Sequence, residues 1–153
     1  MQTKVNLVMY KGPATNFLHK VGHYSTCVFS SIRHLIRRYE LKYIPYSHAE
    51  LVINGICYSS SSRDGGVRSK YIDYAEGKWD VYEITIDIEY ALDWFNENKG
   101  KKYDWAGILR FAIPFLPQNS NQLFCNEALG KMTKVANPED YTPYEYLEIM
   151  LER

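Results

Sequence analysis

The segment Tyr46–Ser60, YSHAELVINGICYSS, decides the fold that this sequence predicts. The pair Asn54-Gly55 is a strong hairpin signal, because the type I′ turn between two antiparallel strands needs positive φ at both central positions. Side chains alternate between the two faces of a strand, so one face of the predicted hairpin combines residues from both strands. These residues are His48, Glu50 and Val52 from the first strand and Cys57, Ser59 and Ser61 from the second. The histidine and the glutamate are either exposed polar residues or part of a site.

The predicted elements around this hairpin complete an α+β domain. Two further strands are predicted at Val5–Tyr10 and Trp79–Ile86. Two helices are predicted at about residues 14–23 and 26–38, with Gly22 between them, and a third at Ile88–Asn98, before Lys99-Gly100. A short helix is predicted from Asp104 onward, and another at about residues 121–135 with Ser120 or Asn121 as its cap. The last helix is predicted from Thr142, where Thr142-Pro143-Tyr144-Glu145 forms a capping box. We therefore expect residues 1–153 to form one α+β domain with a small antiparallel sheet flanked by helices.

The helix predicted near residues 26–38 has an apolar side and a basic side. The apolar side carries Val28, Ile32, Leu35 and Ile36, and the basic side carries Arg33, His34, Arg37 and Arg38. We expect the apolar side to pack in the core and the basic side to face solvent. Lysine and arginine together number 18, as do aspartate and glutamate, so no nucleic-acid partner is expected.

The composition is typical of a globular chain, with 46% hydrophobic and 24% charged residues. No apolar run approaches the ~20 residues that a membrane-spanning helix needs, so no transmembrane segment is predicted. The first residues lack the apolar core of a secretory signal, which predicts a cytoplasmic location. Cys27, Cys57 and Cys125 form no CxxC pair, so neither a zinc site nor a disulfide framework is predicted, and no cofactor is expected.

Cys125 lies in the segment QLFCNEALGKM, in the first turn or so of a predicted helix. Unpaired N–H groups and the positive end of the helix dipole favour a thiolate there, and the same groups can receive an oxyanion. A thiolate nucleophile also needs an imidazole beside it. His48 is the one histidine on a predicted strand, whereas His19, His23 and His34 lie on helical segments and are expected at the surface or at the edge of the core.

Several segments together resemble the circularly permuted branch of the NlpC-type papain-like hydrolases, especially its phage-encoded members. These segments are YSHAELV, YSSSSRDGGVR, WDVYEI, GKKYDWAG and FCNEAL, and they extend over Tyr46–Leu129. The resemblance implies a papain-like fold in which Cys125 is the nucleophile and His48 is the general base and then the general acid. It also implies that Tyr103, in the segment Gly100–Trp105, lies near the cysteine and helps the oxyanion site.

The third catalytic residue is less defined, because the strand after the histidine strand reads Cys57-Tyr58-Ser59-Ser60-Ser61, where the family usually has His, Glu, Asn or Gln. Glu50 lies on the same face as His48, ~6.6 Å along the strand, and is ionised at neutral pH. We prefer Glu50 to Ser59 as the residue that orients His48. Both assignments, Glu50 and Ser59, assume that the helix of Cys125 covers this face of the hairpin. The alternative is that the face is exposed to solvent.

The resemblance implies a thiol hydrolase that cleaves an amide bond through an acyl-enzyme, with a cell-wall peptide of peptidoglycan as the leading substrate. One alternative is a lipid or ester acyl hydrolase or transferase, similar to the lecithin retinol acyltransferase group, for which Phe111–Leu116 could form an apolar lip. Another is a non-catalytic phage protein that binds a host factor, which the 14 tyrosines favour slightly. If the chain is phage-encoded, the expected location extends to the host cytoplasm or the virion.

Overall fold

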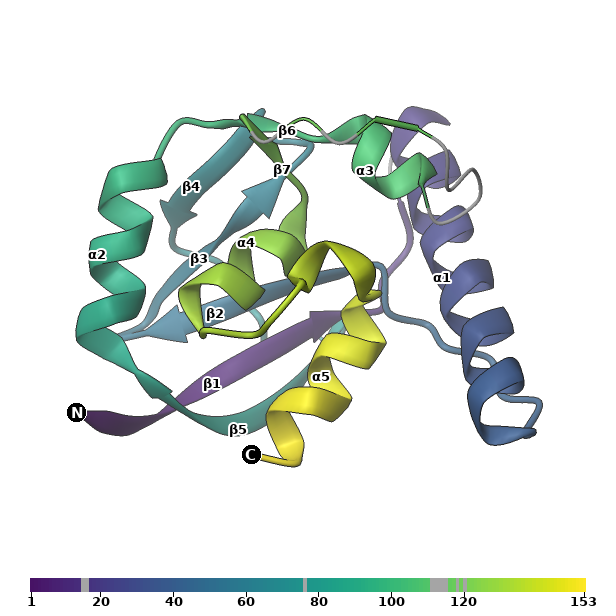
Figure 1. Cartoon of the computed structure of the whole chain (residues 1–153), viewed down its shortest axis with the longest axis horizontal. Coiled ribbons are helices and arrows are strands. Elements are labelled where there is room, and N and C mark those ends of the chain that lie inside the picture. Colours follow the sequence, from purple (N-terminus) through teal and green to yellow (C-terminus); the bar gives the residue numbers. More distant parts are fainter. Residues whose placement is uncertain (15–16, 76, 111–115, 118, 120) are drawn as a thin grey trace.

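The structure is a computed structural model that describes residues 1–14, 17–75, 77–110, 116–117, 119 and 121–153. Within these ranges the chain forms a seven-stranded sheet and five α-helices (Figure 1). The elements in chain order are β1 (Gln2–Tyr10), α1 (Phe17–Arg38), β2 (His48–Ile53), β3 (Ile56–Ser61), β4 (Gly66–Lys70), β5 (Trp79–Asp87), α2 (Ile88–Asn98), β6 (Lys102–Tyr103), α3 (Trp105–Leu109), β7 (Gln122–Leu123), α4 (Cys125–Met132), the 3₁₀ helix η1 (Pro138–Asp140) and α5 (Pro143–Leu151). The α+β class is therefore confirmed.

The sheet has the strand order β5-β1-β2-β3-β4-β6-β7. Its pairs are antiparallel except for β6 and β7, which run parallel. The sheet is thus larger than the small antiparallel sheet expected. The additional strands β4, β6 and β7 are only five, two and two residues long, too short to show a convincing alternation of apolar and polar residues.

The predicted hairpin is confirmed. Asn54 and Gly55 have φ values of 51° and 79°, as a type I′ turn requires, and Val52 pairs with Cys57 in the predicted register. The predicted caps are also present, because Asp104 accepts a hydrogen bond from the Gly107 amide at the start of α3. The capping box at Thr142 opens α5 in the same way.

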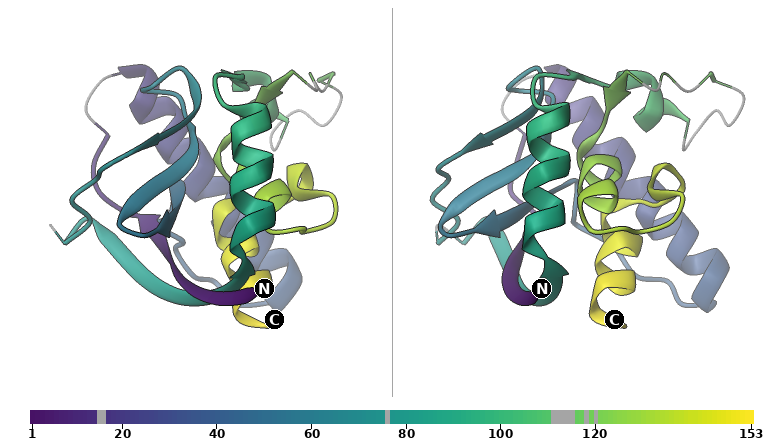
Figure 2. Two further views of the ribbon diagram at one scale, coloured as in Figure 1. Left: turned by 90° about the vertical axis from the view of Figure 1, so that its left-hand side faces the viewer. Right: turned by 60° about the vertical axis from the view of Figure 1, so that its left-hand side comes forward.

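The main hydrophobic core lies between one face of the sheet and the helices α2, α4 and α5, which Figure 2 shows on the same side of the strands. The core joins Leu7 of β1 and Leu51 of β2 to Leu129 of α4. A smaller apolar cluster on the other face contains Val52 and Cys57. His48 and Glu50 alternate with Leu51 along β2, so their strand face is the one opposite α4.

Helix α1 differs from prediction in two ways. It is one continuous helix, and Gly22 does not interrupt it. Its faces are also reversed, because the four residues predicted to be buried are exposed: Val28, Ile32, Leu35 and Ile36. The basic side faces the protein instead, where Arg33 Nε lies 2.9 Å and Arg37 Nη1 3.0 Å from Oε1 of the buried Glu145. A helical pattern shows that two faces exist, but the ion pairs with α5 decide which one packs.

Helix α4 is shorter than the predicted helix at residues 121–135. It begins at Cys125, because Gln122 and Leu123 pair with β6 as strand β7. Asn121 precedes that strand and does not cap the helix, and Ser120 lies outside the described residues. The cap residue is Phe124, which makes no side-chain capping bond. This correction moves Cys125 to the very first position of its helix.

Candidate active site

The thiol of Cys125 sits at the N-terminal end of α4, where that helix meets the first residue of β2. Cys125 is only 3% exposed, and its Sγ lies 3.5 Å from Oδ1 of Asn126. Phe124 makes no side-chain capping bond at this end, and the first turn of α4 contains the buried Glu127. Although α4 covers the opposite face of β2, Cys125 and His48 interact because each begins its element.

His48 connects Cys125 to Glu50. Its Nε2 lies 2.7 Å from Oε1 of Glu50, which leaves Nδ1 as the nitrogen available to Cys125. Burial lowers the pKa of His48, but hydrogen bonding to Cys125 and Glu50 outweighs this and raises the pKa from 6.5 to about 9. The raised pKa keeps the imidazole protonated at neutral pH, which places a positive charge beside Cys125.

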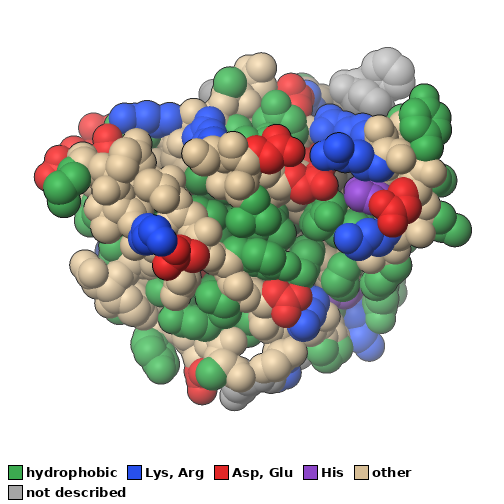
Figure 3. All heavy atoms as spheres, turned by 90° about the horizontal axis from the view of Figure 1, so that it is seen from below, with side chains coloured by type: hydrophobic (Ala, Val, Ile, Leu, Met, Phe, Trp, Pro, Cys, Tyr) green, Lys and Arg blue, Asp and Glu red, His purple; other side chains and the backbone are tan. Residues whose placement is uncertain are grey.

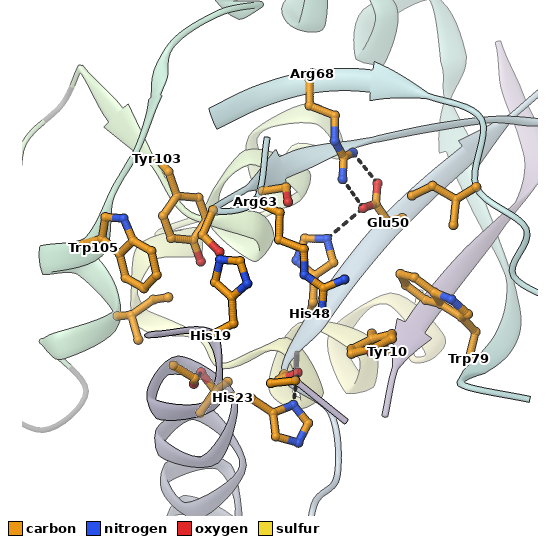
Figure 4. A pocket seen from close by; sticks show the side chains of 18 of the residues that line it. Tyr10, His19, His23, His48, Glu50, Arg63, Arg68, Trp79, Tyr103 and Trp105 are labelled. Carbon is orange, nitrogen blue, oxygen red and sulfur yellow. Dashed lines mark hydrogen bonds and ion pairs between the residues drawn. The ribbon is translucent and has the colours of Figure 1, made fainter. Parts of the chain in front are cut away.

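Glu50 is fully buried and is not the solvent-facing residue that the alternative interpretation required. Arg68 binds it with both terminal nitrogens, Nη1 at 2.6 Å from Oε2 and Nη2 at 2.5 Å from Oε1 (Figure 4). Burial raises the pKa of the Glu50 carboxyl, whereas Arg68 and His48 lower it by more, so the net shift is downward. Two cations thus hold an ionised carboxylate inside the protein.

Ser59 was the other residue considered as the partner that orients His48, but it makes a different contact. Its hydroxyl donates to the carbonyl oxygen of Ala49 at 2.7 Å, so Glu50 is the residue that the structure brings to His48. Ser59 pairs with Arg68 across β3 and β4. Strand β3 lies between β2, which carries Glu50, and β4, which carries Arg68, so Arg68 reaches Glu50 across the strand of Ser59.

Arg68 was missed as a site residue in the sequence analysis, because β4 was not predicted. The available signal was the glycine pair Gly65-Gly66, which indicates a turn after β3. The segment GVRSK follows this turn and runs back antiparallel to β3. Arg68 is held in turn by Asp64, whose Oδ2 accepts from Nε at 2.6 Å and also lies 2.7 Å from Nζ of Lys70. These two cations hold the pKa of Asp64 down at about 2, despite the opposing effect of burial.

Tyr103 lies in β6, close enough to Cys125 for the two groups to interact electrostatically. Burial, the sulfur of Cys125 and the carboxylate of Asp104 all raise the pKa of Tyr103 well above 10. The phenol therefore keeps its proton and remains a hydrogen-bond donor at any physiological pH.

A pocket opens beside these residues, and its walls come from several separate parts of the chain (Figure 4). Helix α1 supplies His19 and His23, and the β3–β4 turn supplies Arg63. The other lining residues include Tyr10, His48, Glu50, Arg68, Trp79, Tyr103 and Trp105. His19 and His23 were expected at the surface or at the edge of the core, and the structure shows that they also line the pocket. Only the packing of α1 reveals this.

A second cysteine–histidine pair, Cys27 and His23, lies within α1. The Sγ–Nε2 distance is 3.9 Å, and Nδ1 of His23 lies 2.6 Å from the Ser47 hydroxyl. Burial and the charge of Arg63 lower the pKa of His23, and burial raises that of Cys27. This pair is therefore neutral at pH 7 and lacks a charged imidazole and carboxylate like those of His48 and Glu50 beside Cys125.

Across the described ranges, no group of three or more His, Cys, Asp or Glu side chains is placed to hold a metal ion. His34, the remaining histidine, is buried against α5 and lies 3.5 Å from Glu40.

Comparison of the chain with protein-family models, curated proteins and solved structures finds no match in any of the three. The family resemblance and the papain-like fold thus stay predictions.

Proposed function

We propose that the chain is a thiol hydrolase that forms an acyl-enzyme on Cys125. The observation that supports this most is the position of His48, which interacts with the Cys125 thiol and at the same time with the buried Glu50 carboxylate. A nucleophile, an acid–base group and an orienting group in this order are the arrangement that covalent acyl transfer needs.

In the first half-reaction the thiolate of Cys125 attacks a carbonyl carbon and forms a C–S bond. The carbonyl electron pair moves onto oxygen, and the bond to the leaving group breaks as the oxyanion collapses. The His48 imidazolium gives its proton to the leaving amine or alcohol. The products are a thioester on Cys125 and a neutral imidazole.

In the second half-reaction water hydrolyses the thioester. Neutral His48 removes a proton from the water as its oxygen attacks the thioester carbon. Expulsion of the sulfur releases the carboxylic acid, and the thiolate–imidazolium pair is restored.

The oxyanion in both steps needs hydrogen-bond donors. The backbone N–H groups at the start of α4 supply a partial positive charge beside Cys125. The Tyr103 hydroxyl, which keeps its proton, is a second donor near the same sulfur. The resemblance implied this role for Tyr103, and the position of Cys125 at the start of its helix implied it for the backbone groups.

Glu50 and Arg68 are positioning residues that do not meet the substrate carbonyl. Glu50 holds the imidazole by Nε2 and stabilises its charged form. Arg68 fixes both carboxylate oxygens, so the plane of Glu50 cannot rotate away from the ring.

The charge of the pocket supports a substrate that carries an acidic group. Arg63 lies over the Tyr10 ring at 5.4 Å, and the ion pairs found among the described residues do not include it. A peptidoglycan stem peptide, with its free carboxylates, fits this cationic wall. We therefore keep a cell-wall peptide amide as the leading substrate.

The lipid acyl alternative is supported by a different observation, the exposed apolar side of α1 next to the pocket. The apolar lip suggested at Phe111–Leu116 lies outside the described residues apart from Leu116. A non-catalytic binding protein would have no use for the charged network around His48, which makes this third alternative the weakest.

The test is hydrolysis of purified peptidoglycan and of acidic phospholipid by the wild type, Cys125→Ala and His48→Ala. The proposal expects product from one substrate class, and a loss of at least about 10³-fold in both variants. Cys57→Ala is the matched control, because Cys57 is equally buried but lies in the apolar cluster of the sheet. Normal turnover in either site variant would contradict the mechanism.

A further inference from the structure

The outward side of α1 carries a continuous apolar stripe. Its residues follow at intervals of three or four and so line one face of the helix: Phe17, Val21, Tyr24, Val28, Ile32, Leu35 and, just past the last turn, Tyr39. Their exposure ranges from 40% for Leu35 to 92% for Tyr39. Hydrophobic side chains gather along the right-hand edge of Figure 3, where α1 lies, next to lysine and arginine side chains.

The inward side of the same helix is polar. Thr26, Ser30 and His34 are buried against the protein, together with Cys27. An ordinary surface helix buries its apolar side and exposes its polar side. Helix α1 does the reverse, and a contiguous exposed apolar surface of this kind marks a site of interaction.

The charge of α1 restricts what can cover the stripe. Phe17–Arg38 contains no acidic residue. Lys20 lies beside Phe17 and Tyr24, and Arg38 lies beside Leu35, so both cations border the same edge of the stripe. Glu40, which follows the helix, faces His34. Glu145 of α5 meets Arg33 and Arg37 on the inner side, and Glu148 of α5 lies 3.9 Å from Arg38 at the edge of the stripe.

A second copy of this chain fits the stripe poorly. If two α1 helices packed antiparallel through their stripes, Lys20 of one copy would approach Arg38 of the other. A parallel pair would place each cation beside its own equivalent. Both arrangements set like charges along an apolar contact, whereas a negatively charged surface is complementary to them.

We propose that the outward side of α1 binds the surface of an anionic lipid bilayer. An amphipathic helix with aromatic and aliphatic residues on one side and cations along the edge lies in the interfacial plane, with its apolar side among the upper acyl chains. At ~1.5 Å per residue the 22 residues of α1 form a rod of ~33 Å that can lie along the surface. Within the described part of the chain no helix is long and apolar enough to cross a membrane. The proposed contact is therefore one in which α1 lies on the membrane surface.

The position of α1 connects this surface with the candidate active site. The helix presents His19, Gly22, His23 and Thr26 to the pocket and the stripe to the outside. A bilayer bound to the stripe is therefore next to the pocket wall. If the proposed function also holds, this placement would bring the substrate of the lipid acyl alternative, such as an acidic phospholipid, close to the pocket.

Co-sedimentation with vesicles tests the docking surface. Vesicles of phosphatidylcholine containing phosphatidylglycerol are expected to carry the chain into the pellet. Vesicles of phosphatidylcholine alone are expected to bind it at least about tenfold more weakly, and added salt should weaken the anionic binding. Equal binding to both compositions, or none to either, would overturn the proposal.

Val28→Glu is the test variant and Val81→Glu is its control. The two valines are 48% and 49% exposed, but Val28 lies in the stripe of α1 and Val81 lies in β5. Val28→Glu is expected to weaken binding to the anionic vesicles by at least about tenfold, whereas Val81→Glu binds like the wild type. Similar losses in both variants would contradict a surface on α1.

Two further measurements separate this proposal from others. Cys125→Ala should bind vesicles like the wild type, so a failure of the catalytic mechanism leaves the docking result intact. Light scattering should show a monomer in solution for both the wild type and Val28→Glu. A wild-type dimer that Val28→Glu dissociates would show that a second copy covers the stripe and would overturn the membrane proposal.

Discussion

Nε2 of His48 and Nη2 of Arg68 both contact one carboxylate oxygen, Oε1 of Glu50, at 2.7 Å and 2.5 Å. The second oxygen receives Nη1 of Arg68 at 2.6 Å. A fully buried carboxylate is thereby shared between an imidazolium and a guanidinium. The account of the site depends on this sharing, because it fixes both the charge and the direction of the imidazole.

Replacing Glu50 by glutamine tests this role. The amide is neutral and would present N–H groups to one of two cations, so the charged imidazole loses its stabilisation. We expect kcat to fall by about 10²- to 10⁴-fold with little change in KM. The alkaline limb of the pH–rate profile should also move to lower pH, because Glu50 raises the pKa of His48.

Ser59→Ala is the matched comparison for that experiment, since Ser59 was the other candidate partner of His48. Its hydroxyl bonds to the Ala49 carbonyl, so the variant should keep most of its activity. An activity loss in Ser59→Ala that equals the loss in Glu50→Gln would show that the wrong partner was assigned.

Replacing Arg68 by methionine should act on stability. The substitution leaves the buried Glu50 carboxylate with His48 alone, and an unpaired buried charge typically costs about 3–5 kcal/mol. We expect the free energy of unfolding in urea to fall by roughly 3 kcal/mol. Arg63→Met removes an arginine from the adjacent β3–β4 turn and should change stability by less than about 0.5 kcal/mol. An Arg68→Met variant with an unchanged free energy of unfolding would mean that Glu50 does not need this partner.

The pH dependence of stability gives a further prediction. The pKa of His48 is raised from 6.5 to about 9 in the folded chain. Its charged contacts therefore stabilise the fold fully below pH 6.5, and this contribution disappears as pH rises toward 9. At about 1.4 kcal/mol per pKa unit the loss has an upper limit of roughly 3.5 kcal/mol.

His48→Gln removes this titration, so subtracting its unfolding curve from that of the wild type isolates the contribution of His48. The difference between the two free energies of unfolding should shrink from pH 6.5 to pH 9. A difference that stays constant over this range would indicate that His48 is not charged in the folded chain.

Local sequence signals predicted much of the fold and the contact between His48 and Glu50. The Asn54-Gly55 turn fixed the hairpin register, and that register placed His48 and Glu50 on one face. Thr142 and Asp104 marked helix starts correctly, because a cap is a contact between residues that are close in the chain.

The features that escaped prediction depend on distant contacts. Arg68 reaches Glu50 across a strand pair whose second member, β4, has no clear pattern. The packed face of α1 was predicted wrongly, because the periodicity of a helix is the same whichever face packs. The face is decided by the ion pair between Arg33 and Glu145, which lie 112 positions apart in the chain. The start of α4 moved to Cys125 because residues 122–123 join a strand that only the folded sheet provides.

The most direct test of the central claim is the alkylation rate of each cysteine by iodoacetamide, measured by mass spectrometry at pH 7 in the wild type and in His48→Ala. Burial raises the pKa of Cys27, and it raises that of Cys57 to about 11, so both should react slowly. The account predicts that Cys125 reacts at least about tenfold faster than either, and that His48→Ala removes this advantage. Equal rates for the three cysteines, or a Cys125 rate that His48→Ala leaves unchanged, would contradict an activated thiolate at Cys125.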